Sequence, residues 1–249
     1  MLIISVDPGQ ARDPTAISVL ERSKMLAEER RVKPGNRSRY AVEHKRALER
    51  LDVIHCERLP LHTPYPNMVD RVAEVHQEAE KLDKDIEVVL DLTGVGRPIR
   101  DMMRPRFKRL QAVTITSGQS QSFDKVHGEW HVPKRVLVSV TAIALQNRAL
   151  TINADIPDAP KLVRELEAFK VKISKAGNDT YEAWRDGDHD DLVLATALGV
   201  WWANMTPQKW EETELGAEQR IKQTVIARNA RRVAQRERGQ RFAGGGRFG

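Results

Sequence analysis

The run Val88-Val89-Leu90 constrains the fold of this 249-residue chain more than any other feature. Charged residues enclose it at Glu87 and Asp91, so the apolar stretch is too short for a helix. It suits a central strand that is buried on both faces, and such strands occur in sheets covered by helices on either side. The run therefore predicts an α/β fold.

Further elements follow on both sides of this run. Two β-branched runs, 1–7 and 15–21, are separated by turn residues and predict a hairpin, and 51–59 predicts a third strand. Between them, 23–50 is a charged segment that predicts an exposed helix or loop insertion. Helical spacing begins at Pro66, with Asn67 as the expected N-cap. The remaining predicted elements are a helix over 98–106, a strand over 112–116, helices over 133–147 and 158–170, a β-hairpin over 169–184 and a buried helix over 189–204. This order predicts helices flanking a mixed central sheet.

The positive charge of the chain is concentrated at its C-terminus. The formal net charge is +6, but residues 219–249 alone contain nine Lys and Arg and a single acid, which leaves 32 basic and 34 acidic residues in 1–218. The pattern predicts a basic amphipathic helix over 216–238 and a Gly/Arg-rich end that does not pack. This tail could hold DNA through counterion release, with Arg231, Arg232 and Arg236 as the candidate contacts, or dock on an acidic protein, or only aid solubility.

Cysteine content and hydropathy exclude several classes of protein. Cys56 is the single cysteine, which excludes an intrachain disulfide and a cysteine-based zinc site. The best apolar run, Leu192–Ala203, is about twelve residues long and falls well short of a membrane span. The N-terminus lacks the basic region of a signal peptide. We therefore expect a soluble cytoplasmic protein without a membrane partner.

Acidic residues stand where carboxylates are energetically costly. Asp7 and Asp91 each end an apolar strand, and Asp190-Asp191 open the most apolar helix. Sites in open α/β sheets form beyond the carboxyl ends of central strands, so Asp7 and Asp91 would lie side by side if their strands are neighbours. Ionised carboxylates held together repel one another unless a cation neutralises them. A hard divalent ion such as Mg²⁺ or Mn²⁺ is the simplest solution, and a pair of such ions roughly 4 Å apart can hydrolyse a phosphodiester.

Each motif also has a plainer interpretation. Asp7-Pro8-Gly9 fits an ordinary turn, and Thr93-Gly94-Val95-Gly96 fits either a strand-to-helix turn or a phosphate-binding loop. His189-Asp190-Asp191 fits an N-cap with acids favoured by the helix dipole. The combination of the three motifs, in this order and at strand ends, points to a site.

Taken together, these motifs resemble a known family. Val6-Asp7-Pro8-Gly9, the run from Val89 to Gly96, and His189-Asp190-Asp191-Leu192-Val193 are similar to segments of the nuclease domain of the large terminase subunit of tailed bacteriophages. The resemblance spans residues 1–204 and leaves 205–249 as the basic tail. It implies a ribonuclease H-like fold and a two-metal endonuclease that uses Mg²⁺ or Mn²⁺ to cut double-stranded DNA, the concatemeric phage genome, during packaging in the host cytoplasm.

The resemblance also implies roles for individual residues. Asp7 matches the metal ligand on the first strand, Asp91 the second carboxylate and Asp191 the carboxylate on the helix. Asp190 is close enough in sequence to replace Asp191, and Asp13 lies where some members have an additional acid. The predicted hairpin Phe169–Trp184 resembles one that lies beside the cleft, where its lysines would contact DNA phosphates; a hairpin that only faces solvent fits equally well. These lysines are Lys170, Lys172 and Lys175.

The chain also departs from a complete large terminase subunit. It has no G-x-x-x-x-G-K-[ST] motif, so a packaging ATPase would have to be supplied separately. We expect either a nuclease domain excised from a longer subunit or a separately encoded nuclease, with a packaging ATPase, the small terminase subunit or the portal protein as partners. The alternatives are a junction-resolving or transposase-like nuclease of the same fold, a sugar kinase or actin-like ATPase, and a DNA-binding or scaffold subunit whose acids are vestigial.

Overall fold

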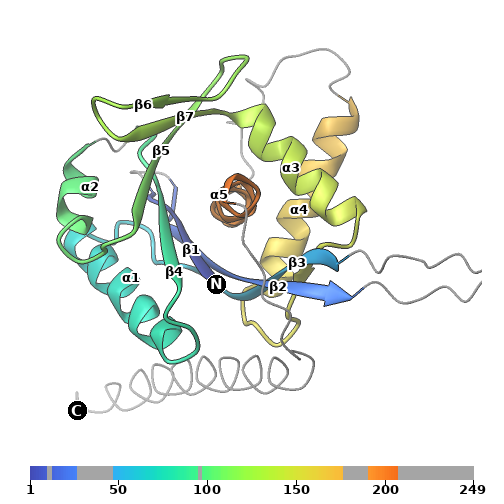
Figure 1. The fold of residues 1–249 in the computed structure, drawn as a ribbon, viewed down its shortest axis with the longest axis horizontal. Coiled ribbons are helices and arrows are strands. Elements are labelled where there is room, and N and C mark those ends of the chain that lie inside the picture. Colours follow the sequence, from blue (N-terminus) through green and yellow to red (C-terminus); the bar gives the residue numbers. More distant parts are fainter. Residues whose placement is uncertain (10–12, 27–46, 95–96, 176–189, 207–249) are drawn as a thin grey trace, which may run out of the picture.

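A computed structural model describes residues 1–9, 13–26, 47–94, 97–175 and 190–206. In these residues eight strands form one mixed sheet in the order β6-β7-β5-β4-β1-β2-β3-β8 (Figure 1). The strands are β1 (Leu2–Asp7), β2 (Ala16–Leu26), β3 (Ala47–Arg58), β4 (Ile86–Asp91), β5 (Leu110–Thr116), β6 (Ser122–Asp124), β7 (Glu129–Pro133) and β8 (Leu150–Ile152). β1 to β3 are consecutive antiparallel strands, while β4 and β5 run parallel to β1 on its other side.

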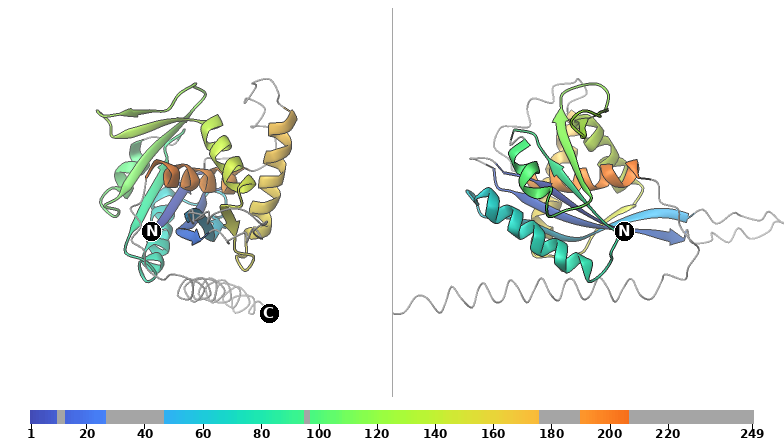
Figure 2. Two further views of the ribbon diagram at one scale, coloured as in Figure 1. Left: turned by 45° about the vertical axis from the view of Figure 1, so that its right-hand side comes forward. Right: turned by 60° about the vertical axis from the view of Figure 1, so that its left-hand side comes forward.

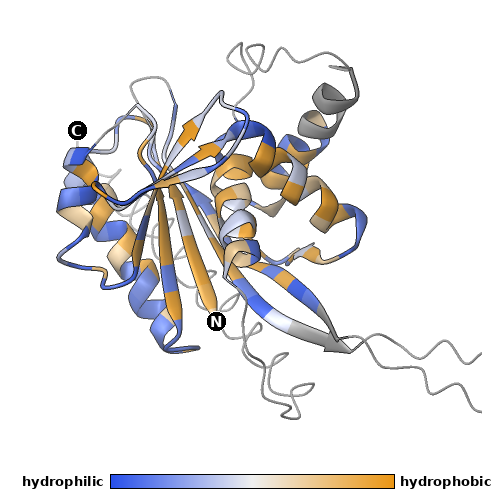
Figure 3. Cartoon of the chain, turned by 45° about the horizontal axis from the view of Figure 1, so that its top comes forward, coloured by the Kyte–Doolittle hydropathy of each residue, from blue (hydrophilic) through white to orange (hydrophobic). Residues whose placement is uncertain are grey.

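Helices cover both faces of the sheet. α1 (Tyr65–Glu80) and α2 (Arg97–Met103) pack on one face, and α3 (Lys134–Gln146), α4 (Ala159–Lys175) and α5 (Asp191–Met205) lie on the other (Figure 2). Each face buries its own hydrophobic cluster, and Figure 3 shows apolar residues along the strands between the two helical layers. The predicted α/β fold, with a mixed central sheet flanked by helices, is confirmed.

α5 is the most deeply buried helix. Twelve of its fifteen residues are buried, because it packs on β1 and β2 while α3 and α4 cover its outer side. The Thr196 hydroxyl donates a hydrogen bond to the Ser18 hydroxyl at 3.1 Å inside this contact. No helix in the described part of the chain is long and apolar enough to cross a membrane. Since α5 is enclosed on every side, the position of its first residue is fixed by the sheet.

Most predicted elements are present with shifted boundaries. The first hairpin is β1 and β2, and the central run is β4, in which all six residues are buried. The ends of the charged segment 23–50 extend β2 and β3, and residues 27–46 lie outside the described residues. Asn67 lies inside α1 and is not its N-cap, because the helix already begins at Tyr65, after Pro64.

The β-hairpin predicted over 169–184 is wrong in its first half. Residues 169–174 belong to α4, which continues without interruption to Lys175. The buried Leu162 and Leu166 are one helical turn apart, and Phe169 and Ile173 continue the same spacing in the sequence, so the helical period extends through the segment that resembled a strand. Lys170, Lys172 and Lys175 therefore belong to the last two turns of α4. The second half, 180–184, lies outside the described residues, as do Arg231, Arg232 and Arg236.

Candidate active site

Two of the predicted acids meet because their strands are neighbours. β1 and β4 pair in parallel, and the register runs from Leu2 opposite Ile86 to Val6 opposite Leu90. Asp7 and Asp91 follow directly at the carboxyl ends of the two strands. Because successive side chains alternate between the faces of a sheet, both acids share the face that carries α5.

The N-terminus of α5 brings two more acids to the same place. Asp191 is the first residue of the helix and is only 4% exposed, and Asp190 occupies the N-cap position. Asp190 makes no capping hydrogen bond with its side chain; its carboxylate instead accepts one from Lys134 Nζ at 3.2 Å. Four of the five predicted acids thus lie within electrostatic reach of one another.

The environment favours protonation of these carboxyl groups. Burial raises the pKa of Asp7 well above its usual value, and the charges of Asp91, Asp191 and Asp190 raise it further. Burial likewise raises the pKa of Asp91 to about 6, although the Thr93 backbone N–H, 2.7 Å from Asp91 Oδ1, and the charge of Lys134 act in the opposite direction. Such a cluster gains stability from any cation that enters it.

The structure adds two basic side chains that sequence reasoning missed. Lys134, at the start of α3, lowers the pKa values of both Asp7 and Asp91 through its charge. Arg58, at the end of β3, places Nη2 3.2 Å from Asp191 Oδ2. A signal for Arg58 was present in the sequence, because a third strand after a hairpin runs parallel to the first and ends at the same edge. Ala16 pairs with both Asp7 and Arg58, which puts all three residues in register.

Glu165 is a further acid that the sequence did not single out. It projects from α4, accepts a hydrogen bond from Arg58 Nη2 at 2.5 Å and another from the Val193 backbone N–H at 3.1 Å. Burial raises the pKa of Glu165 to about 7, and the charges of Asp191 and Asp190 contribute to the rise, while Arg58 and the Val193 N–H oppose it. Its place in the site depends on how α4 packs against α5, which local patterns do not encode.

Asp13 does not join the group. Its side chain is exposed, and it lines a separate cavity of about 270 Å³ together with Gly9, Thr15, Pro60 and residues 62–65. Its charge is not among those that shift the pKa of Asp7. A role for Asp13 in metal binding therefore remains a prediction.

The donor set suits a hard divalent cation. Within the ranges that the structure describes, no three Asp, Glu, His or Cys side chains are already gathered as a metal-ligand set. Asp190 contacts Lys134 and Asp191 contacts Arg58, whereas the carboxylate of Asp7 forms no hydrogen bond or ion pair with a described residue. A partly buried carboxylate that is surrounded by like charges and offers only oxygen ligands fits Mg²⁺ or Mn²⁺. Asp7, Asp91 and Asp191 are the residues that would hold the ion.

Comparison with known proteins finds matches among solved structures. No family model matches the chain, and no curated protein matches it. The chain is similar in structure to the large terminase nuclease of the thermophilic phage G20c with bound zinc, at 17% identity over 80% of this chain and 79% of that chain, with a TM-score of 0.43.

Two structures of the human cytomegalovirus terminase nuclease domain are also similar. Both were soaked with Mn, and one contains an inhibitor; each is 9% identical over 80% of this chain and 81% of that chain, with TM-scores of 0.46 and 0.44. All three are terminase nuclease domains, the class that the sequence motifs resemble. At these sequence identities the similarity concerns the fold and does not by itself assign a function to this chain.

Proposed function

We propose that the protein is a metal-dependent endonuclease that hydrolyses phosphodiester bonds of double-stranded DNA during phage genome packaging. The observation that carries the proposal is the convergence of Asp7, Asp91 and Asp191 from three separate elements, with burial and mutual repulsion raising the pKa of Asp7. An arrangement that is unfavourable for the free protein is what a cation-binding site requires.

The chain's own residues have distinct parts in this mechanism. Asp7, Asp91 and Asp191 would hold and orient the cations, and Asp190 lies next to them at the helix N-terminus. When bound, two Mg²⁺ or Mn²⁺ ions would supply Lewis acidity to the scissile phosphate and an activated water. Lys134 adds a positive charge at the rim of the cluster, where it favours the approach of a phosphate group.

DNA binding beyond the site is assigned to basic segments. Lys170, Lys172 and Lys175 belong to the last turns of α4, on the face of the sheet that carries the acids. Arg231, Arg232 and Arg236 contribute non-specific, salt-sensitive affinity from the C-terminal segment. The proposed partners are a packaging ATPase, the small terminase subunit or the portal protein in the host cytoplasm.

A plasmid cleavage assay tests the proposal. Supercoiled plasmid incubated with the protein and Mn²⁺ should become nicked and then linear, and EDTA should abolish both products. Asp7→Asn and Asp191→Asn should each remove the activity, whereas Asp70→Asn, on the exposed side of α1, should retain it. Activity that survives both site variants would refute the assignment. Preferential symmetrical cutting of four-way junctions would instead identify a junction-resolving nuclease of the same fold.

A further inference from the structure

Arg58 lies between two carboxylates at the site. Its Nη2 atom is 2.5 Å from Glu165 Oε1 and 3.2 Å from Asp191 Oδ2. The three side chains are between 6% and 18% exposed, so water screens their charges little. One positive and two negative charges therefore form a compact group beside the proposed metal ligands.

A β-bulge directs Arg58 into this group. Leu20 pairs with Val53 but Val19 pairs with His55, so Ile54 is the extra residue in β3. Val53 belongs to the core on the α5 face and Cys56 to the same core, which strict alternation from Val53 would not allow. The bulge changes the alternation, and Arg58 consequently faces α5. Bulges that re-aim a side chain in this way are frequent next to active sites.

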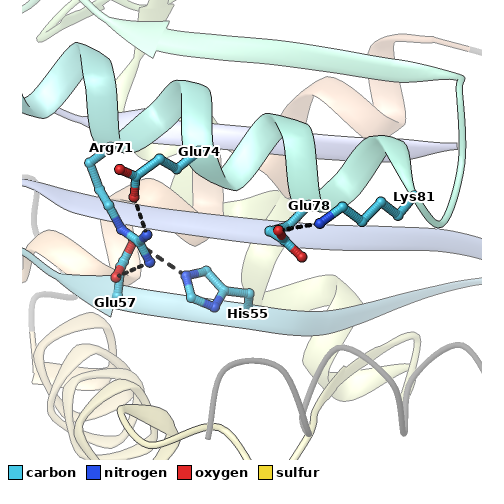
Figure 4. Close-up of polar contacts among 6 residues, drawn as sticks. All are labelled: His55, Glu57, Arg71, Glu74, Glu78 and Lys81. Atoms are coloured by element: carbon cyan, nitrogen blue, oxygen red, sulfur yellow. Dashed lines mark hydrogen bonds and ion pairs between the residues drawn. The ribbon is translucent and has the colours of Figure 1, made fainter. Parts of the chain in front are cut away.

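The neighbouring residue, Glu57, shows the consequence on the other face. It contacts Arg71 of α1, with Arg71 Nε 2.8 Å from Glu57 Oε1 (Figure 4). Adjacent residues of one strand thus form two separate ion-pair groups, Glu57 with α1 and Arg58 with α4 and α5. The site group can be changed without touching the other.

Glu165 also contacts the backbone of the helix that carries Asp191. Its Oε2 atom accepts the hydrogen bond from the Val193 N–H, one of the amide groups that the first turn of α5 leaves without an intrahelical partner. Glu165 is therefore connected to Asp191 in two ways: through Arg58, which contacts both carboxylates, and through its hydrogen bond to the first turn of α5.

We propose that Glu165 is a positioning residue that balances the charge of Arg58, so that Asp191 stays available to a divalent cation. This inference rests on the proposed metal-dependent function. With Glu165 in place, the positive charge of Arg58 is shared between two carboxylates. Without it, the full charge of Arg58 is directed at Asp191 and competes with the metal ion.

Manganese binding to the full chain, measured by titration calorimetry at pH 8, tests this role without relying on cleavage. Glu165→Gln keeps the shape of the side chain and an acceptor for the Val193 N–H, and it should weaken Mn²⁺ binding about tenfold. Arg58→Gln should have the opposite effect and tighten binding, because it removes the competing cation. The double variant should return to within about threefold of the wild type. Glu167→Gln, an exposed neighbour on α4, should leave the affinity unchanged.

The direction in which each variant changes the Mn²⁺ affinity separates the possible roles of Glu165. Weaker binding in both single variants would show that the pair only maintains the fold, and would overturn the inference. A double variant that binds as weakly as Glu165→Gln would show that Glu165 is itself a ligand, and would also overturn it. If no variant differs from the wild type, the inference fails while the proposed function stands. If the wild type binds no Mn²⁺, both fail.

Discussion

Asp7 and Asp91 stand side by side at the carboxyl ends of two parallel strands, and the negative charge of Asp91 raises the pKa of Asp7. Two neighbouring acids, Asp91 buried and Asp7 partly buried, oppose folding once both are ionised. The first consequence concerns the stability of the protein, which should depend on pH and on divalent cations.

Without metal, the free energy of unfolding should fall as pH rises from about 4 to about 7. Asp91 has a pKa of about 6 against an ordinary value of 3.8, and Glu165 one of about 7 against 4.5. In this window Asp91 and Glu165 bind more protons in the native state than in the unfolded state, so their titration favours unfolding as the pH rises. The stabilisation by protonation is complete below the ordinary values and is lost as pH passes the raised ones.

Calorimetric melting with and without Mn²⁺ measures this effect. Because the cation binds the ionised carboxylates, Mn²⁺ should raise the melting temperature more at pH 8 than at pH 5. A metal-free melting temperature that climbs steadily from pH 4 to pH 7, or an equal Mn²⁺ effect at both pH values, would contradict the assignment of the raised pKa values to this cluster.

Replacing Asp7 by asparagine should separate stability from activity. Asp7→Asn removes one of the repelling charges at nearly constant volume, so the metal-free protein should become more stable near neutral pH, where the neighbouring carboxylates ionise. Plasmid nicking should fall by at least about 100-fold, since even the loss of an indirect metal contact typically costs 10- to 100-fold. Chemical denaturation and the plasmid assay measure the two effects. A variant that is both less stable and fully active would show that Asp7 has a purely structural role.

The convergence of Asp7 and Asp91 could be predicted from the sequence because it follows from a general property of sheets. Parallel neighbouring strands end at the same edge, so two acids that end apolar runs meet whenever their strands pair. The buried character of α5 was equally evident from its composition, and Asp190-Asp191 opens it. These features follow from local sequence patterns and from one rule of sheet topology.

Other parts of the site depend on tertiary contacts that local patterns do not contain. Arg58 faces α5 only because Ile54 forms a bulge, and Glu165 reaches Val193 only because α4 packs against α5. The same limit explains why β8 was not predicted. It has only three residues, and it is a strand because it pairs with β3. The first half of the predicted hairpin failed for the converse reason: the sequence of 169–174 alternates like a strand, but it also continues the helical spacing of Leu162 and Leu166.

The ion-pair group on the opposite face should affect stability alone. Burial acts to raise the pKa of Glu57, but the charge of His55 and the hydrogen bonds and charge of Arg71 hold it down at about 2. Glu57→Gln should therefore destabilise the protein by about 2 kcal/mol near neutral pH, the usual effect of losing charged hydrogen bonds at a largely buried site. This contribution is present above the ordinary value of 4.5 and is lost as pH falls toward 2, so the variant should differ least from the wild type in acid.

Glu78→Gln is the matched control for this prediction. Glu78 of α1 pairs with Lys81, the C-cap residue of this helix, and both side chains are more than half exposed (Figure 4). Exposed pairs of this kind contribute little, so the stability should change by less than about 0.5 kcal/mol. Urea denaturation at pH 7 and pH 3 measures all three proteins, and Mn²⁺ affinity should be the same in each. A change in Mn²⁺ affinity in Glu57→Gln would show that the two faces of the sheet are coupled.

The close approach of α5 to the sheet gives the last prediction. A Cβ atom at Gly199 would lie 2.5 Å from Leu20 Cδ1 and 3.0 Å from Ser5 Oγ, both in the buried core. Gly199→Ala should therefore cost about 1–3 kcal/mol, the usual effect of overpacking, although alanine favours the helix itself. Gly118→Ala is the control, because its nearest neighbour would be Thr116 Oγ1 at 3.4 Å. Since α5 carries Asp191, a shift of the helix should also weaken Mn²⁺ binding in Gly199→Ala. Unchanged stability together with unchanged Mn²⁺ affinity would show that the sheet does not fix the position of this helix.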